Sequence, residues 1–215
     1  MYSQRHLTQT DSLLIGLDQA LRTVFGRPAM TGRPNPASAL EEADLNERER
    51  RHIARLMRVN HTGEVCAQAL YQGQAVTAHL PTVRETLERS AAEETDHLAW
   101  CETRLRELGE RRSLLNPVWY TGSFAMGALA GLAGDNWSLG FVVETERQVE
   151  SHLEGHLREI PERDTKTRTL IHQMKADEIH HAEVAKRGGG ADMPRPIQWA
   201  MKAAAKVMTR TAYWV

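Results

Sequence analysis

Apolar residues recur at intervals of three and four along most of this 215-residue chain, which is the spacing of one face of an α-helix. Signals for β-strands are nearly absent, so we expect an all-α protein. Long helices are predicted over about 44–78, about 82–109, from within the apolar segment 117–134 to about 160, and about 163–187.

Proline or glycine ends each predicted helix, at Pro81, Gly109, Pro161 and the triple glycine 188–190. The turns between the first and second helices, and between the third and fourth, are short. Two helical hairpins are therefore expected, packed together as a four-helix bundle.

Shorter segments flank this bundle. Residues 10–25 predict a short amphipathic helix capped by Thr10 or Asp11, and the proline-rich and glycine-rich stretch 26–38 reads as an extended connector. After residue 190 the pattern indicates a last amphipathic helix with a basic side. The expected units are 1–43 (N-terminal helix and connector), 44–187 (bundle, including 117–134) and 188–215 (C-terminal helix).

The segment 117–134 is the most apolar part of the chain, yet it falls just short of a comfortable bilayer span and is followed by Asp135. A buried or interfacial helix is expected. Its composition suits an apolar route for a greasy ligand, and it equally suits tight helix packing through Gly127, Gly131 and Gly134.

Composition adds little about partners. The formal net charge of −1 excludes a polybasic nucleic-acid binder, and two cysteines without CxxC spacing favour free thiols in a reducing compartment. The N-terminal residues lack the pattern of a secretory signal or a transit peptide.

Candidate chemistry appears where glutamates interrupt the helix stripes. Glu94 and Glu178 each open the spacing Glu-x-x-His, with His97 and His181. On a helix such a pair lies about 60° apart with about 4.5 Å of rise, so both side chains can reach one metal ion. Two further glutamates, Glu64 and Glu146, occupy the stripes of the other two helices.

The separations reinforce this interpretation. Glu64 precedes Glu94 by 30 residues and Glu146 precedes Glu178 by 32, with the turn proline near each midpoint. The two glutamates of each hairpin should therefore lie at the same height. Facing hairpins would bring four carboxylates and two imidazoles to one point, which is the known pattern of ferritin-like di-iron and di-manganese carboxylate proteins.

Four carboxylates with neutral histidines carry a charge of −4, which two divalent cations would cancel. Oxygen and nitrogen donors without cysteine suit iron or manganese, and zinc remains open on ligand type.

Two nearby residues have two interpretations each: Tyr71 as core packing or redox gating, and His152 as a contact of a ligand or a surface histidine. Off the stripes, we expect a solvated position or a contact with a ligand for Glu93, Glu144, Asp177 and His180.

Four stretches carry a family resemblance: "RVNHTGEVCAQALYQGQ" (58–74), "EETDHL" (93–98), "VETERQVESHLEGHL" (143–157) and "ADEIHHAEV" (176–184). With these motifs the chain resembles the demethoxyubiquinone hydroxylase family of ubiquinone biosynthesis across about 50–187. The resemblance implies that Glu64, Glu94, His97, Glu146, Glu178 and His181 ligate two iron ions, with Glu94 and Glu178 bridging them. It also places His152 near the metals.

The resemblance further implies oxygen-dependent hydroxylation of a polyprenylated 6-methoxy-3-methyl-1,4-benzoquinol, with reducing equivalents traceable to NADH. No Gly-x-Gly-x-x-Gly fingerprint is present, so the electrons must arrive from an outside donor or through the quinone itself. Expected partners are the quinol, O₂, a membrane surface and other ubiquinone-biosynthesis proteins. The expected location is peripheral, at the cytoplasmic face of a bacterial inner membrane.

Two other functions stay open from the residues alone. A ferroxidase or iron-storage protein would use the same metal ligands. A metal-free helical adaptor would need lysine or arginine to pair with the core glutamates, and the four stripes carry no suitable one.

Overall fold

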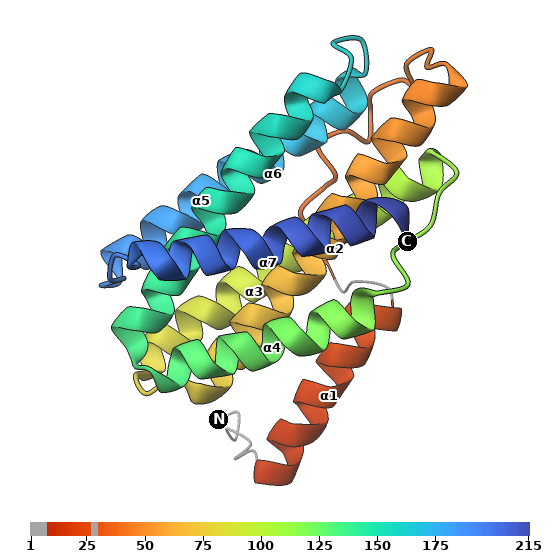
Figure 1. The fold of residues 1–215 in the computed structure, drawn as a ribbon. Coiled ribbons are helices and arrows are strands. Elements are labelled where there is room, and N and C mark those ends of the chain that lie inside the picture. Colours follow the sequence, from red (N-terminus) through yellow and green to blue (C-terminus); the bar gives the residue numbers. More distant parts are fainter. Residues whose placement is uncertain (1–7, 27–29) are drawn as a thin grey trace.

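The computed structural model describes residues 8–26 and 30–215, and within these residues every regular element is an α-helix. A four-helix bundle of α2, α3, α5 and α6 forms the centre, as in ferritin-like proteins, and the predicted fold class is confirmed (Figure 1). The helices are α1 (Gln9–Phe25), α2 (Glu47–Thr77), α3 (Pro81–Glu107), α4 (Asn116–Leu132), α5 (Asp135–Glu159), α6 (Thr165–Arg187) and α7 (Arg195–Trp214).

Local signals set the helix ends. Asn46 caps α2 in a capping box with Glu49, Pro81 opens α3 as its first residue, and the Asp164 carboxylate accepts from the first turn of α6. The predicted cap of α1 was wrong by two or three residues. Thr8 is the cap, and Asp11 is its capping-box partner.

The bundle core consists of two apolar clusters separated along the helix axes. One cluster contains Ile53 and Met57 of α2 with Leu105, Leu153 and Leu170 of the other three helices. The second contains residues nearer the opposite ends of the same helices: Ala67, Tyr71, Val83, Leu87, Leu139, Val142 and Ala185. Between these clusters each helix carries buried polar residues, so the candidate metal ligands lie in a layer closed at both ends by packed side chains.

The third bundle helix does not begin inside the apolar segment, and that prediction was wrong. The segment forms a separate helix, α4, and the chain turns at Gly134 before α5 starts at Asp135. Gly134 has φ 110°, a conformation that L side chains rarely adopt. Hydropathy alone does not reveal such a turn, because both flanking segments continue the helical pattern.

Glycines let α4 approach α2 closely. A Cβ at Gly127 would overlap the backbone carbonyl of Leu70, and one at Gly131 would overlap the Thr77 hydroxyl. The packing interpretation of these two glycines is confirmed. For Gly134 it was wrong, since a Cβ there would meet no atom within 4 Å.

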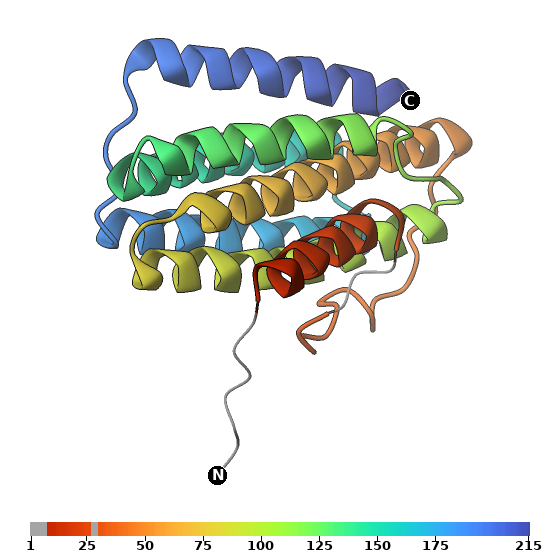
Figure 2. The same cartoon turned by 90° about the horizontal axis from the view of Figure 1, so that it is seen from below.

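The outer helices leave apolar side chains exposed. Helix α1 packs against α2 and α4, and α7 lies along one side of the bundle as a separate layer against α2 and α5 (Figure 2). Among the described residues, none of the helices combines the length and apolar character needed to cross a membrane.

Candidate metal centre

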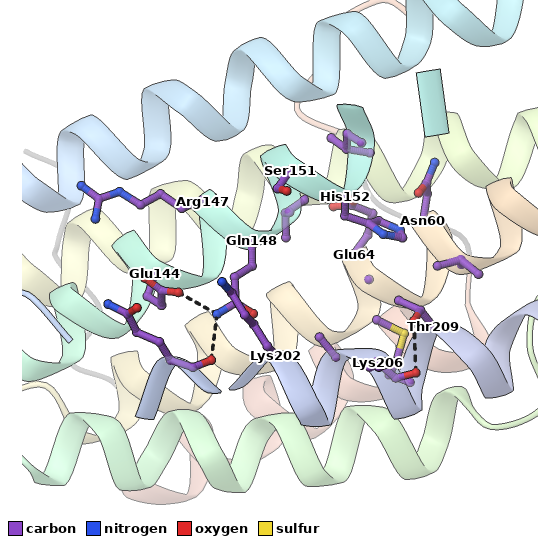
Figure 3. Close-up of a pocket in the computed structure, with 17 residues that line it drawn as sticks. Asn60, Glu64, Glu144, Arg147, Gln148, Ser151, His152, Lys202, Lys206 and Thr209 are labelled. Atoms are coloured by element: carbon purple, nitrogen blue, oxygen red, sulfur yellow. Dashed lines mark hydrogen bonds between the residues drawn. The ribbon is translucent and has the colours of Figure 1, made fainter. Parts of the chain in front are cut away.

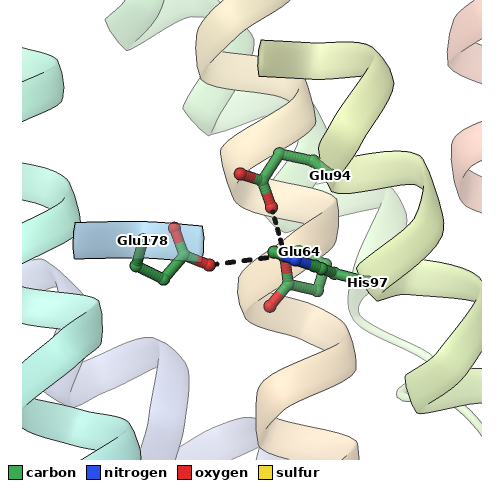
Figure 4. Close-up of side chains that lie close together, drawn as sticks. All are labelled: Glu64, Glu94, His97 and Glu178. Carbon is green, nitrogen blue, oxygen red and sulfur yellow. Dashed lines mark hydrogen bonds and ion pairs between the residues drawn. The ribbon is translucent and has the colours of Figure 1, made fainter. Parts of the chain in front are cut away.

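The structure brings the six predicted ligands together in the polar layer of the bundle. Their donor atoms form two groups, each with all atoms within 4.8 Å of one another, and Figure 4 shows the group that contains Glu64 and His97. Glu94 and Glu178 belong to both groups, which is the arrangement expected of carboxylates that bridge two ions. The groups are Glu64, Glu94, His97 and Glu178, and Glu94, Glu146, Glu178 and His181.

Burial distinguishes this cluster from a solvated acidic patch. All six residues are 0–3% exposed. Across residues 8–26 and 30–215, no lysine or arginine forms an ion pair with any of them, so the pairing that a metal-free adaptor would need is not found there.

Glu146 Oε2 is buried without a hydrogen-bond partner. Three other buried donor atoms face only one another: His181 Nδ1 lies 3.0 Å from Glu94 Oε1 and 3.7 Å from Glu178 Oε2. Leaving such groups unsatisfied costs about 1–3 kcal/mol each, and more when they are charged. Convergent, unsatisfied oxygen and nitrogen donors fit a metal site, and their chemistry suits iron or manganese.

Burial and mutual interactions shift the pKa values of the six side chains in opposite directions. Burial raises the pKa of Glu64 and Glu146 well above the usual range for glutamate, with neighbouring carboxylates adding to the effect. Burial acts in the same direction on Glu94, but the charges of His97 and His181 and their hydrogen bonds together outweigh it and hold the Glu94 pKa well below its ordinary value. Burial lowers the pKa of His181, yet hydrogen bonds to Glu178 and Glu94 outweigh this and raise it to about 12.

In each imidazole, Nδ1 faces glutamates of the cluster, and Nε2 faces an acidic residue outside it. His97 Nε2 lies 2.9 Å from Asp177 Oδ2, and His181 Nε2 lies 2.7 Å from Glu93 Oε2. Such a carboxylate fixes the orientation and tautomer of a metal-binding imidazole and raises its basicity. Glu93 and Asp177 therefore contact two of the predicted ligands, His181 and His97.

These contacts cross between the hairpins. The acid preceding Glu94 holds the histidine of α6, and the acid preceding Glu178 holds the histidine of α3. The sequence signal was the repeated acidic pair, Glu-Glu and Asp-Glu, four and three residues before each histidine. Of the other residues off the stripes, His180 is exposed, whereas Glu144 is buried and accepts a hydrogen bond from Gln148 Nε2.

Tyr71 and His152 both lie beside the cluster. The Tyr71 hydroxyl donates a hydrogen bond to Glu146 Oε1, and its ring packs in the second apolar cluster. His152 is partly buried, and burial lowers its pKa to about 4, so its imidazole is neutral at pH 7. Its Nε2 is buried without a hydrogen-bond partner.

A cavity of about 620 Å³ opens beside Glu64, between α2, α5 and α7. Figure 3 shows His152 and Asn60 close to Glu64, with Lys202 and Lys206 of α7 lining the opposite side. Of the six predicted ligands, Glu64 lines this cavity, which lies between the bundle and α7.

Comparison with known proteins identifies the relatives of this chain. The model of the family described as "Ubiquinone biosynthesis protein COQ7" matches residues 51–212. The chain belongs to the COQ7 family. This confirms the resemblance stated from the motifs around Glu64, Glu94, Glu146 and Glu178.

Curated relatives in the COQ7 family match over nearly the whole chain. Three of them, each named 3-demethoxyubiquinol 3-hydroxylase, come from Nitrosococcus oceani, Nitrosospira multiformis and Dechloromonas aromatica. They are 56%, 58% and 57% identical, over 98%, 95% and 94% of this chain and 99%, 98% and 98% of their own lengths.

Proposed function

We propose that this chain is a di-iron monooxygenase that hydroxylates the ring of a polyprenylated 6-methoxy-3-methyl-1,4-benzoquinol in ubiquinone biosynthesis. The observation that carries the proposal is the buried pair of donor groups sharing Glu94 and Glu178, in a chain whose relatives are named as hydroxylases of that quinol. A pair of iron ions bound there would supply the oxygen chemistry.

The reaction balances with an outside reductant. One oxygen atom of O₂ enters a ring C–H bond, and the other leaves as water after taking up two electrons and two protons. We propose that these electrons derive ultimately from NADH and reach the site through another molecule.

The residues of the chain hold and shield the site. Glu64, Glu94, His97, Glu146, Glu178 and His181 would hold the two ions, while Asp177 and Glu93 orient the imidazoles. The apolar clusters on both sides of the ligand layer exclude water. The substrate ring would approach through the cavity beside Glu64 and His152.

A bacterial strain blocked at this hydroxylation provides the test. We expect expression of the chain to restore ubiquinone and to consume the demethoxy precursor, and ¹⁸O₂ to label the new ring oxygen. Accumulation of the unchanged precursor would refute the substrate assignment. If the purified protein instead oxidised Fe²⁺ and retained many ferric ions per chain, a ferroxidase would be the better assignment.

We further propose that the chain lies peripherally on the cytoplasmic face of a bacterial inner membrane, where other ubiquinone-biosynthesis proteins would be its neighbours. Support comes from the free thiols of Cys66 and Cys101 and from adjacent helices α1 and α4, whose outer residues are more than half exposed. These residues are Leu14, Leu17, Leu21, Phe25, Val118, Leu129 and Leu132.

Vesicle flotation checks this proposal. The protein should float with vesicles that contain phosphatidylglycerol, and replacing Leu17 and Leu21 together by serine should weaken partitioning by about 10-fold, because two apolar side chains no longer enter the interface. Lys206→Gln tests the basic side of α7. This variant should partition more weakly than the wild type at low salt, and the difference should disappear at high salt. Equal flotation of the leucine variant would contradict a role for α1.

A further inference from the structure

The two donor groups are nearly symmetric, but the residues behind them are not. Asp177, which holds His97, receives a second ion pair: Arg33 Nη2 lies 2.6 Å from the same Oδ2 atom that faces His97. Glu93, which holds His181, pairs with no lysine or arginine in the part of the chain that the structure describes.

Arg33 belongs to an N-terminal strap, defined here as residues 30–45, that precedes α2. Thr31 donates from its backbone N–H and its hydroxyl to the two carboxylate oxygens of Asp96, a fully buried residue next to His97. Further along the strap, Glu42 pairs with Arg104 of α3 and Lys166 of α6. The strap therefore ties together the two helices that carry the Glu-x-x-His pairs.

The Arg33 guanidinium is fixed on two sides. Besides Asp177, it lies over the ring of Trp100 with its Cζ 5.1 Å from the ring centroid. Trp100 itself packs against His97, with ring centroids 5.4 Å apart. Arg33 thus contacts two of the neighbours of the His97 ring, Asp177 and Trp100.

We propose that Arg33 is a positioning residue of the metal centre, which acts through Asp177 on His97 and makes the two metal positions inequivalent. The strap lies outside residues 51–212, the part matched by the family model, so the centre extends beyond the bundle that the family pattern describes. This inference rests on the dinuclear centre of the proposed function and is independent of its quinol substrate.

The effect of Arg33 on the orientation of Asp177 and His97 should outweigh the effect of its charge on metal binding. The positive charge of Arg33 by itself would disfavour a nearby cation, but the side chain is 34% exposed, so water and salt screen that repulsion. The hydrogen-bond geometry that it imposes on Asp177 is not screened in this way. Without Arg33, Asp177 keeps only His97 and Gln173 as hydrogen-bond partners among the described residues.

The test is a metal titration of the full chain with Co²⁺, an oxygen-stable divalent probe. In Arg33→Met we expect one of the two equivalents to bind about 10-fold more weakly, at the lower end of the range for losing a group behind a metal ligand. The other equivalent should be unchanged, and Arg33→Lys should restore most of the loss. Arg163→Met, which removes a guanidinium that pairs with Glu49 at a surface site, is the matched control.

A spectroscopic readout separates positioning from general stability. In Mössbauer spectra of protein loaded with ⁵⁷Fe²⁺, Arg33→Met should shift one quadrupole doublet, and Glu93→Gln should shift the other. In an Asp177→Asn background, Arg33→Met should have no further effect on metal affinity.

Unchanged affinities and spectra in a folded Arg33→Met protein would overturn the inference, as would tighter binding or an equal loss in the Asp177→Asn background. If Arg33→Met does not fold, the same comparisons apply to Arg33→Gln, which also removes the charge of the guanidinium and its ion pair with Asp177. Failure of the wild-type chain to bind two equivalents would refute the dinuclear centre itself, so the two failures are distinguishable.

Discussion

Replacing Glu178 by alanine should remove both metal ions, because Glu178 belongs to both donor groups. Each ion would lose a carboxylate oxygen, and the affinity for each should fall by more than the roughly 10–100-fold that follows loss of a group behind a ligand. Glu146→Ala should behave differently, since Glu146 belongs only to the group of His181. This variant should lose affinity mainly for one of the two ions, so the purified protein should retain about one metal ion per chain.

Metal analysis of protein purified without added iron would measure this difference, with hydroxylation of the quinol as a second readout. Glu183→Ala is the matched control, because Glu183 is an exposed glutamate on the same helix whose ion-pair partner is Arg187. Circular dichroism of the metal-free proteins would show whether each variant folds. Full metal content in folded Glu178→Ala protein would contradict the assignment of a bridging carboxylate.

The sequence was sufficient to predict the bundle and the convergence of six side chains, because both follow from helical periodicity and from turns near the midpoints between paired glutamates. Pro81 opens α3 directly, and Pro161 lies just after α5. Helix rise then places Glu64 level with Glu94, and Glu146 level with Glu178. No long-range information is needed for this step.

Other features depend on contacts between segments far apart in the chain. The pairing of Asp177 with His97 spans 80 residues, and that of Arg33 with Asp177 spans 144. Composition classed residues 26–38, which overlap the first part of the strap, as an extended connector, but residues 36–39 form a turn and the side-chain contacts of the strap were not predicted. The turn at Gly134 was missed for a local reason, because a positive φ leaves no mark in a hydrophobic pattern.

Loading the metal-free protein should release about four protons when two divalent ions bind near neutral pH. The raised pKa values of Glu64 and Glu146 favour a proton on each of these two carboxyl groups. The charge of Glu94 and the hydrogen bonds to Asp177, Glu178 and Glu64 outweigh burial and raise the pKa of His97, and His181 is raised to about 12, so both imidazoles are protonated as well. Glu94 and Glu178, with lowered pKa values, are ionised.

In that state two carboxylates balance two imidazoliums, and the metal-free cluster is neutral. Two divalent ions on four carboxylates and two neutral imidazoles are neutral too, so metal binding exchanges four protons for two ions at constant charge. Because the metal-free state binds more protons, raising the pH favours loading and lowering it favours release. The overall binding constant for both ions should rise by about four powers of ten per pH unit, and less steeply above the raised pKa values of Glu64 and Glu146.

Calorimetric Co²⁺ titrations in buffers of different ionisation enthalpy would count the protons directly. At Co²⁺ concentrations high enough to load both ions, Glu146→Gln should release about one proton fewer, since the amide has none to lose, whereas Glu183→Gln should leave the count unchanged. Release of no protons, or of only one, would mean that the cluster keeps its carboxylates ionised without metal. Charge neutrality of the buried layer would then have to come from another source, although no lysine or arginine among residues 8–26 and 30–215 pairs with the six ligands.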